Sequence, residues 1–471
     1  TFFSPDEYWQ SLEVAHEYVF GYGYLTWEWT HKVRGFTHPM LFALGLEETE
    51  WIILAPKVFQ AVFAAIGDIY TYKLAGKLFG NGAAKWALVS SLICFFNFFC
   101  AVRTFSNSIE TSLTAVAMFY WPWNYTSKTT WTASHIRNLQ ISLAFAAIAC
   151  ILRPTNAVIW LYLGTTLLTQ LPLPSLPTSL LSVTLIALTL STLLDYTFYN
   201  EWTLVPLTFL RFNLSHGIST FYGIHTWHWY LSQGIPIVLF TFTPLTIYTA
   251  LTTRVRGVRG VLGFTVLVYS LVAHKEFRFI MPLLPVSLGA AGDALYGMQV
   301  GVGGKFRFRA VVVGLVLTNA IAAFYLGVVH QRGVVDVMGW LRKRSSEDGG
   351  VLFLMPCHST PFYSHLHRKD IEMRFITCEP PLEPSIDKKS YQDESDVFYA
   401  DPVAFVDTYF SKDKTFAASG KRTRTDRLLS VPGQDSYQIQ EYVWPSRVVL
   451  FQALLKDVCT LWVCHQFNLN V

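Results

Sequence analysis

Long apolar runs alternate with short polar stretches from about residue 50 to residue 328. About ten runs are bounded by charged residues, Gly or Pro, near residues 50–74, 86–102, 109–122, 139–152, 156–170, 176–194, 235–252, 260–273, 277–296 and 309–328. A helix needs roughly 20 apolar residues to cross a bilayer, so the longer runs predict membrane-spanning helices and the shorter ones predict broken or buried helices. The pattern therefore predicts an all-α polytopic membrane bundle over residues 50–329.

The two flanks of this bundle differ from it in composition. Residues 1–49 form a loop ahead of the first run, while residues 330–471 are polar and charged and predict a mixed α/β domain. Within that domain, Arg447 to Cys464 predicts a strand followed by a packed helix, or else a helix lying on the membrane surface. Of the 471 residues, 52% are hydrophobic and 14% are charged, against about a quarter charged in a soluble domain. Because residue 1 is Thr, we expect a membrane anchor to precede this segment.

Basic residues gather in the loops on one side of the predicted bundle. With strict alternation of spans, this side receives Lys73, Lys77, Lys85, Lys128, Arg137, Arg254, Arg256, Arg259, Lys305, Arg307 and Arg309. Short loops rich in Lys and Arg face the cytosol. The first loop and the 330–471 domain are therefore predicted to lie in the lumen.

Two adjacent carboxylates, Asp6 and Glu7, stand just ahead of the apolar runs. A carboxylate at a bilayer surface can take the proton from an acceptor hydroxyl during sugar transfer, while a second one orients that hydroxyl or the sugar. The alternative is a surface helix with solvated acids.

Cationic residues lie at the predicted lumenal ends of several spans. The candidates for binding a lipid phosphate are Arg103, Arg153, His274, Lys275 and Arg278. The last three belong to a stretch of four ionisable residues with almost no loop around it, which is costly near a membrane unless it binds something. Arg offers a bidentate fork to phosphate and Lys a point charge. For Arg103 and Arg153 taken singly, the alternative is a side chain that extends to the lipid headgroups.

Aromatic residues are dense in the first loop. Tyr8, Trp9, Tyr24, Trp27 and Trp29 are candidates for stacking on sugar rings, and Glu28 is a candidate for binding sugar hydroxyls. The alternative is an aromatic belt at the membrane interface.

Other sites depend on the predicted orientation. Cys357 and Cys378 can pair in an oxidising lumen, and Asn213 starts an Asn-Leu-Ser sequon in a predicted lumenal loop. No His/Cys spacing suggests a metal site, no cofactor is required by the sequence, and no nucleic-acid patch stands out.

Several stretches together resemble glycosyltransferase family 22, the dolichyl-phosphate-mannose-dependent mannosyltransferases. They are PDEYWQSLEVAHEYVFGYGYLTWEWT, Arg34 to Pro39, RTFSNSIET, RPTNA, AHKEFRFIMPLLP, MPCHSTPFYSHLH and DESDVFYADP, spread over the chain to about residue 450. The family's acidic pair falls on Asp6 and Glu7, whereas the His that precedes Pro-Asp-Glu in the broader family is Ser4 here. MPCHSTPFYSHLH points to the branch that adds the third mannose to the GPI-anchor precursor.

The resemblance implies a GT-C architecture in the endoplasmic reticulum membrane and an inverting transfer of α1,2-linked mannose. The implied partners are dolichyl-phosphate-mannose, the dimannosyl GPI intermediate and membrane lipids. Asp6 would be the base, with Glu7 orienting the reactants.

Three alternatives stay open at this point. A sister enzyme of the same family would act on dolichol-linked oligosaccharide. A lipid transporter or scramblase would also carry ionisable residues in a bundle, but it usually shows two similar halves, which this sequence lacks. An inactive subunit would not need to keep Asp6, Glu7 and the cationic stretch.

Overall fold

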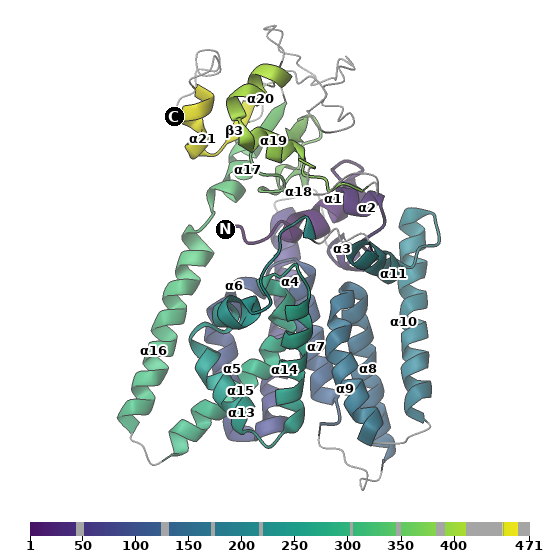
Figure 1. Ribbon diagram of the computed structural model, residues 1–471, viewed down its shortest axis with the longest axis vertical. Helices are drawn as coiled ribbons and strands as arrows, with labels where there is room; N and C mark the ends of the chain where they lie inside the picture. The colour runs from purple at the N-terminus through teal and green to yellow at the C-terminus, as the bar shows by residue number, and fades with distance from the viewer. Residues whose placement is uncertain are drawn as a thin grey trace.

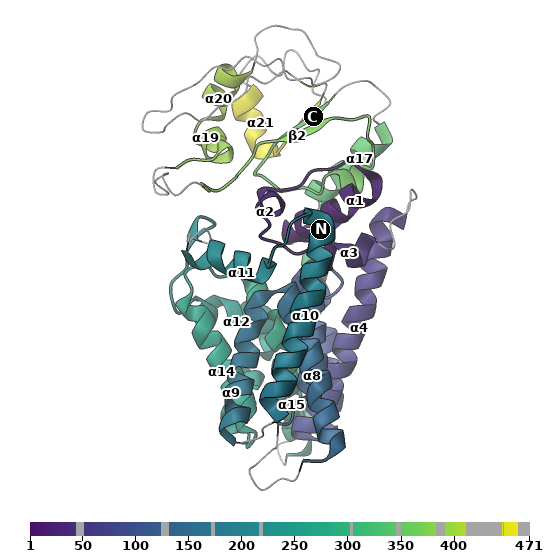
Figure 2. The same cartoon turned by 90° about the vertical axis from the view of Figure 1, so that its right-hand side faces the viewer.

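The computed structural model describes residues 1–43, 51–123, 131–170, 175–215, 220–301, 305–344, 350–382, 391–410, 445 and 447–459. Three parts follow one another from the bottom to the top of Figure 1: a bundle of long helices, a layer of short N-terminal helices, and a C-terminal domain. The N-terminal layer lies between the other two in both side views (Figures 1 and 2).

Short helices make up the N-terminal layer. Its elements are η1 (Tyr8–Leu12), α1 (Glu13–Phe20), α2 (Trp27–Thr30) and α3 (Thr37–Ala43). Helix α1 ends at Gly21, whose φ of 73° places it in the left-handed region that glycine adopts without strain.

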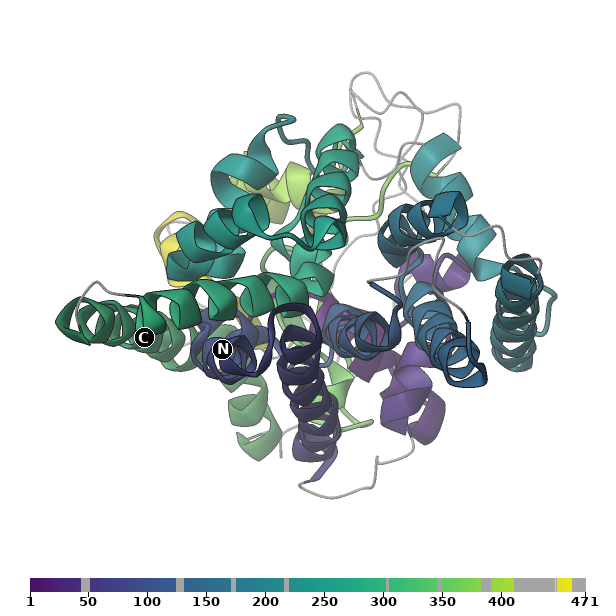
Figure 3. The same cartoon turned by 90° about the horizontal axis from the view of Figure 1, so that it is seen from below.

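The bundle forms where the apolar runs predict it. Its first half holds α4 (Trp51–Phe79), α5 (Asn81–Ile93), α6 (Phe95–Cys100), α7 (Ser106–Tyr120), α8 (Ala133–Leu152), η2 (Pro154–Asn156), α9 (Ala157–Gln170) and α10 (Ser175–Tyr199). After α11 (Val205–Leu210) and η3 (Arg211–Ser215), its second half holds η5 (Tyr230–Gly234), α12 (Ile235–Leu239), η6 (Phe240–Phe242), α13 (Thr243–Thr252), α14 (Arg256–Leu271), η7 (Phe277–Leu283), α15 (Leu284–Val300), α16 (Lys305–Phe324) and η8 (Tyr325–Val329). Seen end-on, the helices of the two halves lie next to one another (Figure 3). Six helical stretches of the described residues are long and apolar enough to cross a membrane, which confirms the predicted helical, multi-pass class.

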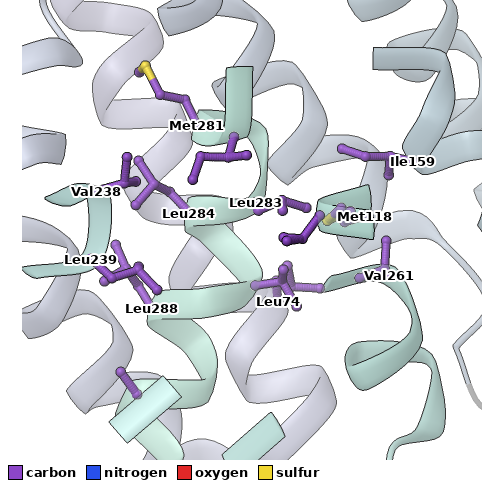
Figure 4. Close-up of a cluster of buried hydrophobic side chains, with 14 of the residues drawn as sticks. Leu74, Met118, Ile159, Val238, Leu239, Val261, Met281, Leu283, Leu284 and Leu288 are labelled. Atoms are coloured by element: carbon purple, nitrogen blue, oxygen red, sulfur yellow. The ribbon is translucent and has the colours of Figure 1, made fainter. Parts of the chain in front are cut away.

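Burial separates the central helices from the peripheral ones. Of the most apolar window in the span Phe277–Val300, 83% is buried, against 11% in Leu180–Tyr199. Helix α15 approaches α5 closely because residue 292 is glycine: a Cβ there would lie 2.4 Å from the backbone nitrogen of Ala87. Side chains from helices of both halves of the bundle meet in the core beside α15, as Figure 4 shows for Leu74, Met118, Leu283 and Leu288 among others.

The C-terminal domain is a small α/β unit, as predicted. Strand β1 (Val351–Leu354) is the central strand of a three-stranded parallel sheet, between β2 (Met373–Phe375) and β3 (Arg447–Leu450). Its helices are α17 (Gly333–Arg344), α18 (Tyr363–Leu366), α19 (Glu394–Ala400), α20 (Pro402–Tyr409) and α21 (Gln452–Cys459). The strand-then-helix prediction for Arg447 onward is confirmed through Cys459, and residues 460–464 lie outside the described part of the chain. Asp401 caps α20 by accepting a hydrogen bond from the backbone N–H of Ala404.

Candidate active site

Asp6 and Glu7 lie in the first turn of the N-terminal layer. The turn starts at Pro5, whose carbonyl accepts hydrogen bonds from the backbone N–H groups of Tyr8 and Trp9, both at 2.9 Å. Successive residues of a helix point about 100° apart, so the two carboxylates are directed at different partners.

Glu7 forms a buried ion pair with Arg103. A guanidinium nitrogen of Arg103 donates to Glu7 Oε2 at 2.6 Å, and the Glu7 side chain is only 1% exposed. The same guanidinium also donates to the carbonyls of Phe99 and Thr1, at 2.9 and 3.0 Å. Thr104 Oγ1 donates to the backbone carbonyl of Glu7 at 2.8 Å. Glu7 is thus tied to the α6–α7 turn through both side chain and backbone.

Asp6 faces the other side and pairs with Arg278 of η7. Arg278 divides its donors: one nitrogen donates to Ser4 Oγ at 2.9 Å and another to Glu276 Oε1 at 2.7 Å. Burial alone would raise the pKa of Glu276, but the adjacent Arg278 and His274 bring it below the usual range. The side chains of Asp6 and Arg278 are each 10% exposed, so this pair is buried but less completely than Glu7.

Further cations converge on Asp6. The guanidinium groups of Arg153 and Arg278 lie 5.6 and 5.9 Å from the centre of one ring, that of Phe279. Arg34 interacts electrostatically with Asp6, Arg278 and Arg153. Arg278 therefore pairs with Asp6 directly, while Arg34 and Arg153, from two other parts of the chain, act on it electrostatically.

Each arginine of this group already has an acidic partner of its own. Arg34 donates to Glu28 at 2.8 Å, and Arg153 lies 3.6 Å from Glu110 of α7. Asn156 holds Glu110 in place with a hydrogen bond of 2.8 Å. Each guanidinium carries five N–H donors, so the cluster can bind an anion with donors that these acids leave free or by exchanging some of these contacts.

Two of the predicted phosphate ligands are directed elsewhere. Lys275 is 2% exposed, and its Nζ donates to the backbone carbonyls of His225, at 3.0 Å, and Val272. His274 bonds to the carbonyl of Gly223 at 3.0 Å and to Glu276 at 3.1 Å. In this conformation both residues shape the loop before η7, and only Arg278 of this stretch reaches the acids. A phosphate role for Lys275 and His274 stays a prediction.

The predicted sugar platform is largely packed inside the protein. Tyr8 stacks on Phe2 and contacts His365 edge-to-face, and Trp9 donates from Nε1 to the carbonyl of Thr360 at 3.0 Å. Trp29 is 2% exposed.

The rest of the platform also has protein partners. Tyr24 packs on Trp9 and Phe375, and Trp27 donates from Nε1 to the Tyr222 hydroxyl at 3.0 Å. Glu28 accepts from Arg34 and from Gln10 at 3.0 Å. These rings already pack against protein groups. Stacking of sugars on them stays a prediction.

With this geometry in view, the comparisons with known proteins are decisive. Residues 1–367 match the Alg9-like mannosyltransferase family. The chain belongs to this family. GPI alpha-1,2-mannosyltransferase 3 of Mus musculus is 40% identical over 427 residues, covering 87% of this chain and 76% of the mouse protein. GPI mannosyltransferase 3 of Yarrowia lipolytica is 40% identical over 436 residues, covering 90% and 82%.

A solved structure shows the same fold. ArnT from Cupriavidus metallidurans, in a crystal structure bound to undecaprenyl phosphate, is similar with a TM-score of 0.55 and 13% sequence identity. The match covers 79% of this chain and 81% of that chain. The predicted GT-C class of this mannosyltransferase is confirmed.

Sequence reasoning missed a third carboxylate, Glu13, which joins the N-terminal layer to the C-terminal domain. Glu13 is fully buried and accepts from the backbone N–H groups of Phe362, at 2.8 Å, and Ser364, at 3.1 Å, and from the Ser364 hydroxyl. Burial raises the pKa of Glu13 to about 7, against these hydrogen bonds, which lower it. The quoted motifs contain all three residues, but their pairing across some 350 positions carries no signal in a single sequence.

Two histidines near the acids were missed as well. The His358 ring packs against Trp9 at a tilt, with ring centres 4.6 Å apart, and burial lowers its pKa to about 4 although Asp6 favours its protonated form. His38 is 5% exposed, its Nε2 has no hydrogen-bond partner, and burial lowers its pKa to about 3. Both rings are therefore neutral at pH 7. His38 lies in the quoted Arg34–Pro39 stretch and His358 in MPCHSTPFYSHLH. Their place in these motifs is the sequence feature that could have marked them as site residues.

Cys357 and Cys378 form a disulfide with their Cα atoms 5.8 Å apart. These cysteines and His358 are near enough together to ligate a metal, but thiolates are required for that and both sulfurs are used in the bond. Asn213 lies in η3, half-buried, and its Nδ2 donates to the carbonyl of Phe209 at 2.9 Å. Glycosylation of Asn213 stays a prediction, and it requires that this hydrogen bond be given up.

Proposed function

We propose that this mannosyltransferase transfers mannose from dolichyl-phosphate-mannose to the dimannosyl GPI-anchor precursor, in an α1,2 linkage. The observation that carries the proposal is the identity of about 40% to GPI alpha-1,2-mannosyltransferase 3 of Mus musculus and to GPI mannosyltransferase 3 of Yarrowia lipolytica, over most of both chains. The proposed site opens to the lumen of the endoplasmic reticulum, because the acids lie at the end of the bundle opposite the Lys- and Arg-rich loops.

In the proposed mechanism Asp6 acts as the base. It takes the proton from the acceptor 2-hydroxyl, which attacks the anomeric carbon from the face opposite the dolichyl phosphate and inverts its configuration. The anomeric C–O bond breaks, and its electron pair leaves on the phosphate oxygen. The leaving phosphate stays anionic, so it needs positive charge and no proton donor.

The arginines beside Asp6 supply that charge in this proposal. Arg278 and Arg153 would hold the donor phosphate with forked hydrogen bonds, and Arg34 would add to the field. Because Arg278 is paired with Asp6, a phosphate that competes for Arg278 would release Asp6 for catalysis. Donor binding would then make the base available.

The test is complementation of cells that lack the third-mannose step, with lipid-linked intermediates separated and identified. The chain should convert accumulated dimannosyl GPI species to trimannosyl species. Persistence of the dimannosyl species, despite normal abundance of the protein in the membrane, would overturn the proposal. Rescue of truncated dolichol-linked oligosaccharides instead would assign the chain to the sister branch of the family.

A further inference from the structure

A lone carboxylate, Asp68, lies at membrane depth away from the proposed site. It occupies the middle third of α4, inside the candidate span Trp51–Phe79. Among the residues that the structure describes, no basic side chain forms an ion pair with Asp68. The two lysines that follow Asp68 on its own helix have other contacts: Lys73 lies over the Tyr70 ring, and Lys77 donates to the carbonyls of Phe119 and Trp121. An unpaired charge inside a bilayer is expensive, so such a residue needs a counter-charge.

Asp68 borders a cavity of about 20 Å³ between α4, α5, α6, α7 and η7–α15. This volume accommodates one water-sized occupant. One wall is apolar and includes Met281, Leu284 and Leu288, which Figure 4 shows on neighbouring turns of η7–α15. The opposite wall is polar, and its side chains are Asp68, Thr71, Ser91, Asn97, Ser108, Thr111 and Ser112.

Every hydroxyl of the polar wall already donates its proton to another protein group. Ser91 donates to Asp68 Oδ1 at 2.5 Å. The others donate to backbone carbonyls: Thr71 at 2.8 Å, Ser108 at 2.6 Å, Thr111 at 2.7 Å and Ser112 at 3.3 Å. What these oxygens can still offer to the cavity is lone pairs.

The amide of Asn97 follows the same pattern. Its Nδ2 donates to Asp68 Oδ1 at 3.2 Å and to the backbone carbonyl of Ser91 at 3.0 Å. Two donors, from Ser91 and Asn97, thus meet on one oxygen of Asp68, which suits an ionised carboxylate. The occupant of the cavity therefore faces one negative charge and a wall of oxygen acceptors.

We propose that this cavity is a sodium site, with Asp68 as the charged ligand and hydroxyl and amide oxygens of the polar wall as neutral ligands. A hard cation takes oxygen ligands, and sodium sites at membrane depth are built in this way from few charges. Calcium and magnesium sites usually hold more than one carboxylate or keep several waters, and the wall offers one carboxylate and little space. A single positive charge neutralises Asp68.

The site joins helices that also support the candidate active site. Asp68 belongs to α4, Ser91 to α5, Asn97 to α6 and Ser112 to α7, and α7 also carries Glu110, the partner of Arg153. Helices α4 and α7 meet closely here, since a Cβ at Gly67 would lie 2.9 Å from Ser112 Oγ. A bound ion would fasten this junction, so its measurable effect is on stability, whether or not the proposed reaction is correct.

The experiment measures thermal unfolding of the purified full chain in detergent, with sodium chloride replaced stepwise by choline chloride at constant ionic strength. The unfolding temperature should rise with sodium and saturate, by about 3 °C for a site well above its Kd. Potassium should give a smaller shift. In Asp68→Asn the sodium-dependent shift should be lost.

Asp293→Asn is the matched control, because Asp293 is another acid within a membrane span, on α15, and does not line the cavity. This variant should keep the sodium shift. If Asp68→Asn cannot be purified, Ser112→Ala should raise the sodium concentration for half of the shift several-fold. A wild-type unfolding temperature independent of sodium would overturn the proposal and indicate a water beside a protonated Asp68. An equal sodium shift in wild type and Asp68→Asn would overturn it as well.

Discussion

Asp6 and Glu7 are neighbours in the chain, yet they lie in two different environments. On the Glu7 side, Arg103 has its donors committed to Glu7, Phe99 and Thr1, and the carboxylate is 1% exposed. On the Asp6 side, Arg278 is shared with Glu276, and the carboxylate is 10% exposed.

This difference gives a structural reason for separate roles of the two residues. Breaking a sealed pair leaves an uncompensated buried charge, so Glu7 is suited to anchor the first turn onto α6–α7. Asp6 shares its cation with a second acid, so its charge can be released when a ligand takes up Arg278. The comparison favours Asp6 as the base and Glu7 as an anchor.

The largest expected effect separates these two carboxylates directly. Asp6→Asn should lower turnover by about 10²- to 10⁴-fold, because it removes a positioned base, while membrane insertion and abundance stay unchanged. Mannose transfer to a synthetic acceptor, normalised to folded enzyme, gives the measurement.

Glu7→Gln is the control for that experiment. It leaves Arg103 without its anionic partner, which should destabilise the fold by about 3–5 kcal/mol, seen as a lower unfolding temperature. Turnover per folded molecule should fall less than in Asp6→Asn. Near-normal turnover in Asp6→Asn, or a greater catalytic loss in Glu7→Gln, would reverse the assignment.

The next effect compares the two arginines. Arg278→Lys keeps the charge but removes the fork, so the KM for the lipid-phosphate donor should rise about tenfold, since a hydrogen bond to a charged group contributes about 1.5 kcal/mol or more. The KM for the acceptor should stay near its wild-type value.

Arg103→Lys serves as the matched variant on the Glu7 side. It should lower the unfolding temperature with little change in either KM. Equal rises of the donor and acceptor KM in Arg278→Lys would count against a phosphate role for Arg278.

The membrane bundle was predictable because its signal is local. Apolar runs bounded by charge mark helices such as α4 and α15 whatever their neighbours are. The acidic pair was also predictable, since a cluster of carboxylates at a membrane boundary is unusual and matches a family motif.

The partners of the acids were not predictable. Glu7 meets Arg103 and Asp6 meets Arg278 across 96 and more than 270 residues, and the pairing depends on how the first turn, the α6–α7 turn and η7 pack. Lys275 shows the same limit, because its position beside Arg278 in the chain suggested a shared ligand while its Nζ is directed to backbone carbonyls. Residue type and spacing indicate which chemistry is present, whereas tertiary packing decides which groups meet.

The last prediction concerns folding stability alone and uses Glu13, which is buried like Glu7 but is held by neutral donors without a cation. Its pKa is about 7 in the folded protein against 4.5 when exposed, so folded protein binds the proton more tightly. The stability that this provides is complete below pH 4.5 and is lost as pH rises to 7, by about 3 kcal/mol in all.

Glu13→Gln removes this dependence, so relative to wild type the variant should be more stable at pH 8 than at pH 5. The measurement is the difference between the unfolding temperatures of wild type and Glu13→Gln, taken at pH 5 and at pH 8. Nearby histidines contribute to both proteins, so their opposite pH dependence cancels in this difference. Asp370→Asn, at an exposed carboxylate, should show no such change. A constant difference between wild type and Glu13→Gln from pH 5 to 8 would mean that Glu13 is ionised throughout, and that burial without a cation does not distinguish it from Glu7.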